Sequence, residues 1–284
     1  MYVISKQISN KLIDSIKIIT NFGIQIQNML FNEIVFGPIK SRRLGVSLGI
    51  NLLPTTGKIC TFDCIYCECG YNADGHTQQG FPPRKAVSKA LEAKLQELKA
   101  SGITPDVFTF SGNGEPTLHP KFERIMDDTI ELRNKYFPEA KISVLSNATM
   151  LHKESVFRAL NKVENNILKL DLVDEEKVRM IDQPLQPSFS IAQVIENLKR
   201  FNGNLIIQTI FLKGAHKGQI IDNTGKNDVD AWIAALKEIN PKQVMIYTVD
   251  RETPEKTLKK ISLEELNSIA GKLKNEGFNV SVSG

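Results

Sequence analysis

Short β-branched runs alternate with longer amphipathic segments along most of this 284-residue chain, and this alternation constrains the fold more than any other feature. The predicted strands are 45–52, 106–110, 141–145, 167–172, 205–212 and 243–248, with a short edge strand at 278–282. The predicted helices lie between them, near 86–100, 120–135, 152–163, 190–201, 228–239 and 263–275. Strands separated by helices of this length form right-handed crossovers and a parallel sheet. We therefore predict an α/β fold whose six units make either an open sheet or a partial barrel.

Composition excludes several classes of protein. The sequence is 41% hydrophobic and 24% charged, which is enough apolar surface for a packed core and argues against disorder. It holds no run of eighteen apolar residues, so we expect no membrane-spanning helix. The formal net charge of +4 is too small to indicate a nucleic-acid-binding protein by itself.

The first 35 residues are predicted to be an N-terminal extension, and residues 36–284 to be one catalytic domain. Apolar residues recur at helical spacing in the extension, at Ile8, Leu12, Ile16 and Ile19. This spacing predicts an amphipathic helix, although the second methionine at Met29 is also consistent with a start site placed too far upstream. Because the segment has no unbroken apolar core and no small-residue cleavage site, we expect a cytoplasmic protein.

All four cysteines lie within ten residues, in the segment CTFDCIYCECG that follows the first predicted strand. The first three, Cys60, Cys64 and Cys67, have the spacing C-x3-C-x2-C, and Cys69 follows. Thiolates this close in sequence can converge on one soft metal ion or on an iron–sulfur cluster.

Three interpretations of this loop compete. A disulfide is disfavoured, because thiols inside a cell stay reduced. Structural zinc usually takes four ligands from two separated pairs, and this chain has no second pair. A [4Fe–4S] cluster held by three cysteines would leave one iron without a protein ligand, where a small molecule can bind. The histidines form no metal-binding motif, and we expect surface positions for His76, His119, His152 and His216.

The cysteine motif, with an aromatic residue directly before its third cysteine, resembles the signature of the radical SAM enzymes. Other segments are similar to that family, namely SGNGEPTLHP at 111–120, SNA at 146–148 and KLD at 169–171. Two further stretches, FGPIKSRRLGVSLGINLLP at 36–54 and YTVDRETP at 247–254, resemble the radical SAM core of wybutosine-synthesising enzymes. The resemblance runs from about Phe36 to the C-terminus. It implies a partial (β/α)6 TIM-like barrel with parallel strands.

The resemblance also implies chemistry. Cys60, Cys64 and Cys67 would hold a [4Fe–4S] cluster as its metal ligands and catalytic residues. S-adenosylmethionine would chelate the open iron and be cleaved reductively, giving a 5′-deoxyadenosyl radical that abstracts hydrogen from a substrate. Such an oxidoreductase needs an external one-electron reductant of the flavodoxin or ferredoxin type. Because all cysteines lie in one loop, we expect no second cluster in this chain.

Polar residues also follow the other predicted strands, which favours a single site at the carboxyl ends of the barrel strands. Gly112 and Gly114 lack side chains, so the backbone can approach a ligand closely there. By resemblance, Glu115 would accept hydrogen bonds from the ammonium group of S-adenosylmethionine. Asn147, or Ser146 beside it, would contact the ribose hydroxyls.

Lys169 and Asp171 stand two apart on a predicted strand, so their side chains share one face. By resemblance, Lys169 would meet the cofactor carboxylate, Asp171 the ribose, and Tyr66 would pack against the adenine or beside the cluster. Two alternatives stay open, a buried ion pair and a Schiff-base lysine, although the second would leave the cysteine loop unexplained.

The substrate class stays open between tRNA, a protein and a small molecule. The wybutosine-like subgroup favours tRNA, whose phosphates Arg42, Arg43 and Arg251 can meet. Against tRNA, the net charge is only +4 and the chain has no run of five basic residues. The alternative from a different class is a non-catalytic zinc or iron–sulfur binding protein, which would not need Glu115 or Asp171.

Overall fold

The computed structural model describes residues 30–41, 43–75 and 77–284. The predicted N-terminal helix, Arg42 and His76 lie outside the described residues. Within the described part, no helix combines the length and the apolar character needed to cross a membrane.

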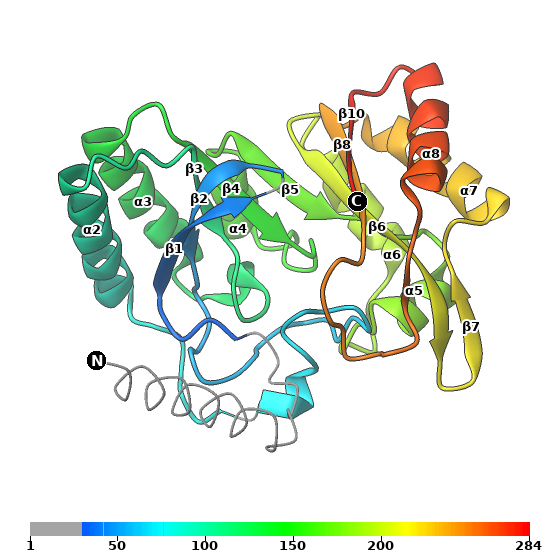
Figure 1. Ribbon diagram of the computed structural model, residues 1–284, viewed down its shortest axis with the longest axis horizontal. Coiled ribbons are helices and arrows are strands. Elements are labelled where there is room, and N and C mark those ends of the chain that lie inside the picture. Colours follow the sequence, from blue (N-terminus) through cyan, green and yellow to red (C-terminus); the bar gives the residue numbers. More distant parts are fainter. Residues whose placement is uncertain (1–29, 42, 76) are drawn as a thin grey trace, which may run out of the picture.

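One curved sheet organises the described residues, with strands in the order β1-β2-β3-β4-β5-β6-β8-β10 (Figure 1). Its parallel strands are β2 Gly45–Ile50, β3 Val107–Phe110, β4 Lys141–Ser146, β5 Asn165–Lys169, β6 Ile206–His216, β8 Gln243–Thr248 and β10 Val280–Ser283. β1 and β10 stand at opposite ends of this order, so the barrel is open between them. The predicted α/β partial barrel is confirmed, including the last strand near 278–282.

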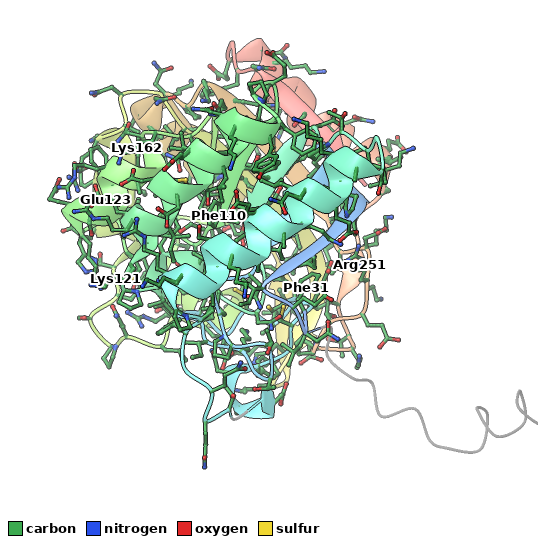
Figure 2. All side chains as sticks on the ribbon, turned by 90° about the vertical axis from the view of Figure 1, so that its left-hand side faces the viewer. Phe31, Phe110, Lys121, Glu123, Lys162 and Arg251 are labelled. Atoms are coloured by element: carbon green, nitrogen blue, oxygen red, sulfur yellow. The ribbon has the colours of Figure 1, made fainter. Side chains whose placement is uncertain are left out.

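Helices connect the parallel strands. They are α2 Arg84–Ala100, α3 Phe122–Tyr136, α4 Glu154–Leu160, α5 Glu175–Ile181, α6 Ile191–Lys199, α7 Lys226–Ile239 and α8 Leu263–Asn275. Figure 2 shows the outer side of this layer, where Lys121, Glu123 and Lys162 point away from the sheet. Glu123 and Lys162 pair with each other and with the surface residues Arg158 and Asp127, so this face is an ordinary solvated surface.

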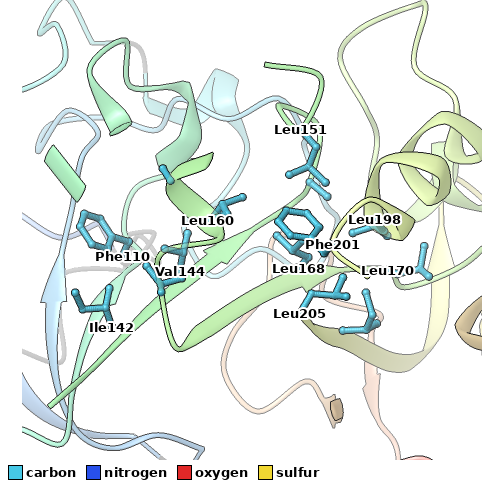
Figure 3. Packing of buried hydrophobic residues seen from close by; sticks show 14 of the residues in the cluster. Phe110, Ile142, Val144, Leu151, Leu160, Leu168, Leu170, Leu198, Phe201 and Leu205 are labelled. Carbon is cyan, nitrogen blue, oxygen red and sulfur yellow. The ribbon is translucent and has the colours of Figure 1, made fainter. Parts of the chain in front are cut away.

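The hydrophobic core fills the space between the sheet and its helices. Strand residues Phe110, Val144 and Leu168 meet helix residues Leu160 and Leu198 there, each of them fully buried (Figure 3). Burying a side chain of this size stabilises the fold by about 1.5–3 kcal/mol. The core therefore holds the strands rigidly and fixes where their carboxyl ends lie.

The structure also contains elements that the sequence pattern did not predict. β1 Val35–Ser41 pairs antiparallel with β2. It was not predicted because it contains Gly37 and Pro38, and both residue types are uncommon inside strands. β6 runs to His216, beyond its predicted end at 212, because β7 Gln219–Asp222 and β9 Lys259–Lys260 pair with its extension. The remaining unpredicted elements are α5 and two 3-10 turns at Asn72–Gly75 and Pro116–Leu118.

Candidate active site

The segments with predicted site residues gather at one edge of the barrel. The cysteine loop follows β2, and the segments 111–115, 146–148 and 170–171 follow β3, β4 and β5. Because these strands are parallel, their carboxyl ends meet at the same edge, which is where barrel enzymes carry their active sites.

A buried lysine closes the cysteine loop. Lys58 is 4% exposed, and its Nζ donates hydrogen bonds to the Gly70 carbonyl at 2.6 Å and to Asp63 Oδ1 at 3.3 Å. Asp63 Oδ1 also accepts from the backbone and the amide of Asn72, whose Oδ1 in turn accepts from the Cys60 N–H at 2.9 Å. The loop is therefore held in shape by contacts within the chain. We did not predict this cluster, because nothing in the local pattern distinguishes Lys58 from a surface lysine.

None of the four cysteines is in a disulfide among the described residues, and their surroundings differ. Burial raises the pKa of Cys60 to about 12. A hydrogen bond from Cys69 lowers the pKa of Cys67 to about 6, with a further contribution from the positive charge of Lys58. Burial opposes the charged form of Lys58, but the thiolates of Cys67, Cys60 and Cys64 outweigh it and raise the lysine pKa. All three motif cysteines thus interact electrostatically with one buried lysine.

This donor set fits an iron–sulfur cluster. Cys60, Cys64 and Cys67 belong to one mostly apolar group that also contains Tyr66, which shields thiolate ligands from water. Among the described residues, no three Cys, His, Asp or Glu side chains stand close enough to hold a single metal ion. A cluster does not require such close grouping, because each thiolate binds a different iron.

Gly114 joins the cysteine loop to the end of β3. It adopts a φ of +129°, and a Cβ there would lie 1.9 Å from the Ile59 carbonyl oxygen, so only glycine fits. Ile59 pairs with Gly114 as an isolated parallel bridge, and Glu115 N–H donates to Ile59 O at 3.1 Å. At Gly112, an added Cβ would meet the Asn51 side chain at 2.3 Å. The close approaches that we expected toward a ligand are, in this structure, approaches to the chain itself.

Glu115 is a buried anchor and not an open carboxylate, with 2% of its surface exposed. Its Oε1 accepts from Thr117 N–H at 3.0 Å and Ser146 Oγ at 2.9 Å, and its Oε2 accepts from Asn147 N–H at 2.7 Å. Burial raises the pKa of Glu115, while these hydrogen bonds act in the opposite direction. Glu115 therefore ties the ends of β3 and β4 together. Among the described residues, Oε2 accepts a single one of these hydrogen bonds, which leaves it acceptor capacity for an ammonium group.

Asn147 joins the carboxyl end of β4 to the cysteine loop through hydrogen bonds. Its amide Nδ2 donates to Thr61 Oγ1 at 2.7 Å and lies 3.6 Å from Cys60 Sγ, and its Oδ1 accepts from Thr149 Oγ1 at 2.7 Å. Ser146 is equally buried, and its hydroxyl donates to Glu115. Asn147 therefore contacts a motif thiol directly, and Ser146 is linked to Asn147 through Glu115.

Lys169 and Asp171 form the buried ion pair that was one of the alternatives, with Nζ 3.1 Å from Oδ2. The Tyr66 hydroxyl contacts both of them, and the Lys169 ammonium lies 4.6 Å from the centre of the Tyr66 ring. Asp171 Oδ1 also accepts from Ile210 N–H at 3.0 Å. The structure thus brings Tyr66, Lys169 and Asp171 together beside the cysteine loop.

Asp182 completes this network and was not predicted. It is 3% exposed, its Oδ1 accepts from Tyr66 at 3.0 Å, and Cys64 Sγ donates to it at 3.5 Å. Burial and the nearby Asp171 carboxylate raise the pKa of Asp182 to about 7. It follows α5, a seven-residue helix too short to stand out in the sequence, so no pattern marked it.

A cavity of about 220 Å³ opens beside these residues. Tyr66, Cys67, Gln208, Tyr247, Arg43 and Arg251 line it. Arg251 pairs with Glu68 at 2.7 Å, next to Cys67, so the segment after β8 also reaches the site. The structure thus brings Arg251, which the sequence analysis named as a phosphate contact, to the same barrel mouth.

The expected surface position of His119 was wrong. His119 is 4% exposed, its Nε2 lies 2.9 Å from the Pro82 carbonyl, and its Nδ1 accepts from Lys121 N–H at 3.0 Å. It serves the packing of the turn before α3 and lies outside the site described above. His152 is exposed as expected.

A family model described as the radical SAM superfamily matches residues 55–222. A UPF0026 protein of Helicobacter pylori is 32% identical over 238 residues, which cover 82% of this chain and 71% of that protein. A radical SAM methyltransferase from Sphaerobacter thermophilus shares the fold with a TM-score of 0.62 and 14% identity, over 84% of this chain and 65% of the other. A structure of TYW1 with a lysine-pyruvate adduct bound aligns with a TM-score of 0.55 and 13% identity, over 81% of this chain and 73% of the other. The chain thus spans slightly less than two thirds of the methyltransferase.

Proposed function

The chain belongs to the radical SAM superfamily and is a radical SAM enzyme, and from this premise we propose that it cleaves S-adenosylmethionine reductively and abstracts hydrogen from a substrate. The observation that carries this proposal is the convergence of three free thiols with the ends of β3, β4 and β5 at one barrel edge. A protein that only stored metal would not need the buried polar network around them.

We assign the cluster ligands to Cys60, Cys64 and Cys67. The chemistry that a bound [4Fe–4S] cluster supplies is one-electron reduction of S-adenosylmethionine to methionine and a 5′-deoxyadenosyl radical. The chain's own contribution is to hold the thiols in a preformed loop, through Lys58 and Asn72, and to keep water from them.

We assign the cofactor contacts to the residues that border the thiols. We assign Lys169, whose ammonium lies beside Tyr66 and Asp171, to the cofactor carboxylate, and Asp171 to the ribose hydroxyls. Asn147 is also assigned to the ribose, and Ser146 and Glu115 hold it in position. Gly112 and Gly114 lie in the turn after β3 that also contains Glu115, and we assign them to the cofactor-binding site with it. The contacts of Asn147 with Thr61 and Cys60 support this assignment.

The proposal extends to the setting of the enzyme. We attribute the activity to residues 36–284 and give no role to residues 1–35. An oxidoreductase of this kind needs an external one-electron donor of the flavodoxin or ferredoxin type, and we place it in the cytoplasm, where thiols stay reduced. The substrate is tRNA, a protein or a small molecule. Arg43 and Arg251 line the 220 Å³ cavity, and either can bind a negatively charged group of the substrate.

Anaerobic reconstitution with iron and sulfide tests the proposal. We expect a brown protein that, once reduced with S-adenosylmethionine, releases 5′-deoxyadenosine above a no-enzyme control. A chain that takes up no cluster but binds one zinc ion tightly would contradict the proposal and favour a structural metal site.

A further inference from the structure

We infer that Arg43 forms a subsite for an oxyanion, a carboxylate or phosphate group, carried by a small substrate. This inference rests on the proposed function, because it places the substrate in the cavity beside the cysteine loop. The sequence analysis named Arg43 only as one of three arginines that can meet the phosphates of a tRNA. Its position in the fold indicates a different role.

Arg43 contacts a strand near the opposite end of the sheet. It lies in the turn between β1 and β2, at one end of the strand order, yet its guanidinium lies 4.6 Å from the ring centre of Tyr247 on β8, near the other end. The side chain therefore links this turn to β8. Stacking on an aromatic ring fixes the plane of the guanidinium, which is how arginine is prepared for binding a planar anion.

The guanidinium has a donor without a partner. Arg43 Nη1 is buried and makes no hydrogen bond with the described residues. Burying a charged donor without an acceptor is costly, so such an atom marks a place where a ligand would supply the acceptor. A carboxylate or a phosphate matches the fork of the guanidinium with two parallel hydrogen bonds.

The other charges at this cavity have partners within the chain. Arg251 pairs with Glu68 at 2.7 Å, and Asp250 pairs with Lys260 at 3.2 Å. Behind the cavity wall, Lys169 pairs with Asp171. The charge that these pairs leave uncompensated is therefore the positive charge of Arg43, which favours an anion.

Arg43 also borders a second cavity of about 600 Å³ at the opposite ends of the strands. Two carboxylates, Asp106 and Glu139, face that cavity together with Lys141. That cavity therefore has as many carboxylates as basic side chains. Beside Cys67, in contrast, both lining carboxylates pair with cations other than Arg43, Glu68 with Arg251 and Asp250 with Lys260. We therefore place the anion on the side of the cysteine loop.

The size of this cavity restricts the ligand. Its volume of about 220 Å³ is below the roughly 300–1,000 Å³ of typical ligand pockets. It can take the charged end of a small organic acid or phosphate ester, next to the position where hydrogen abstraction would occur. A folded nucleic acid would have to meet Arg43 from outside the barrel, so the cavity favours a small substrate.

Titration calorimetry with two probes, succinate and inorganic phosphate, tests the inference. The full chain is studied both cluster-free and reconstituted with S-adenosylmethionine. We expect saturable binding of at least one probe, weakened at least tenfold in Arg43→Met, which keeps an apolar stem over Tyr247. Arg43→Lys keeps the charge but loses the fork, and we expect a loss of three- to tenfold. Arg158→Met, which removes an exposed arginine paired with Glu123, is the matched control and should bind like the wild type.

Which probe binds distinguishes the two sources, since a carboxylic acid substrate predicts succinate and a phosphate ester predicts phosphate. Absence of binding to the wild type, or equal binding by Arg43→Met, overturns the inference. A parallel loss of affinity for S-adenosylmethionine in Arg43→Met also overturns it, because Arg43 would then serve the cofactor. If Arg43→Met does not fold, the comparison of Arg43→Lys with the wild type decides. Failure of the wild type to release 5′-deoxyadenosine would instead contradict the proposed function, and the cluster-free titrations would still decide the role of Arg43.

Discussion

The Lys58 ammonium lies 2.6 Å from the Gly70 carbonyl, so a buried cation joins the two ends of the cysteine loop. This contact predicts that the loop keeps its shape before any cluster is bound. Lys58→Met should destabilise the cluster-free chain by about 1–3 kcal/mol, because it removes the side-chain donor to the Gly70 carbonyl and one of the donors to the Asp63 carboxylate.

Urea unfolding of the cluster-free protein measures this effect. Lys162→Met is the control, since it removes a half-exposed lysine from a surface ion pair with Asp127, which typically contributes no more than about 1 kcal/mol. Equal unfolding free energies for the two variants would show that Lys58 does not hold the loop. We also expect Lys58→Met to take up less iron on reconstitution.

Gly114→Ala should be among the most damaging single substitutions in the chain. The new Cβ would lie 1.9 Å from the Ile59 carbonyl oxygen in a backbone conformation that already disfavours alanine. We expect a loss of about 2–4 kcal/mol in unfolding free energy together with poor cluster incorporation. Gly102→Ala is the matched control, because Gly102 also has a positive φ but no atom within 4 Å of its Cβ position. A similar loss in both variants would reduce the effect at Gly114 to backbone strain.

Substitution of a motif cysteine and substitution of Cys69 should have different effects on the cluster. Cys64→Ala removes a motif thiol, and we expect it to abolish both the brown colour and the cleavage of S-adenosylmethionine. Cys69→Ala should leave iron content and 5′-deoxyadenosine release nearly intact, because its Sγ contacts the Gly112 carbonyl at 3.4 Å and its neighbour Cys67 provides the motif ligand. Iron content and product release, measured side by side, check this. A comparable loss in Cys69→Ala would mean that Cys69 is itself a ligand.

Asp171→Asn should weaken cofactor binding without removing the cluster. Asparagine keeps an oxygen for the Ile210 N–H, but it loses the charge that faces Lys169 at 3.1 Å. We expect at least a tenfold higher dissociation constant for S-adenosylmethionine, with unchanged iron content. Equilibrium dialysis of the reconstituted protein measures the constant, and Asp230→Asn, a surface carboxylate paired with Lys226, is the control. Full affinity in Asp171→Asn would leave Asp171 as a structural partner of Lys169.

The strands and the three motif cysteines were predictable because their signals are local. Periodicity over a few residues locates β3 or β8, and spacing alone selects Cys60, Cys64 and Cys67. Asp182 and Lys58 were not predictable, because their roles depend on which distant backbone groups the folded loops bring to them. Glu115 shows the limit in another way, since the sequence pattern locates it after β3 but does not show that its hydrogen bonds tie it to Ser146 and Asn147. A sequence pattern shows which residues reach the site, and only the packing shows which of their atoms are already engaged.

His119 makes the stability of the cluster-free chain depend on pH. Burial lowers its pKa below the usual value of 6.5, and its Nδ1 accepts from Lys121 N–H, an arrangement that only the neutral ring permits. The unfolded chain therefore takes up the proton more readily than the folded one, so stability falls as pH drops from about 6.5 toward the lowered pKa. Urea unfolding at pH values from 8 to 5, which bracket the reference pKa of histidine at about 6.5, measures this dependence. His119→Gln should flatten the curve in this window, whereas His152→Gln, at an exposed position, should leave it unchanged. If the curves of wild type and His119→Gln run parallel, the loss of stability comes from carboxylates elsewhere and not from His119.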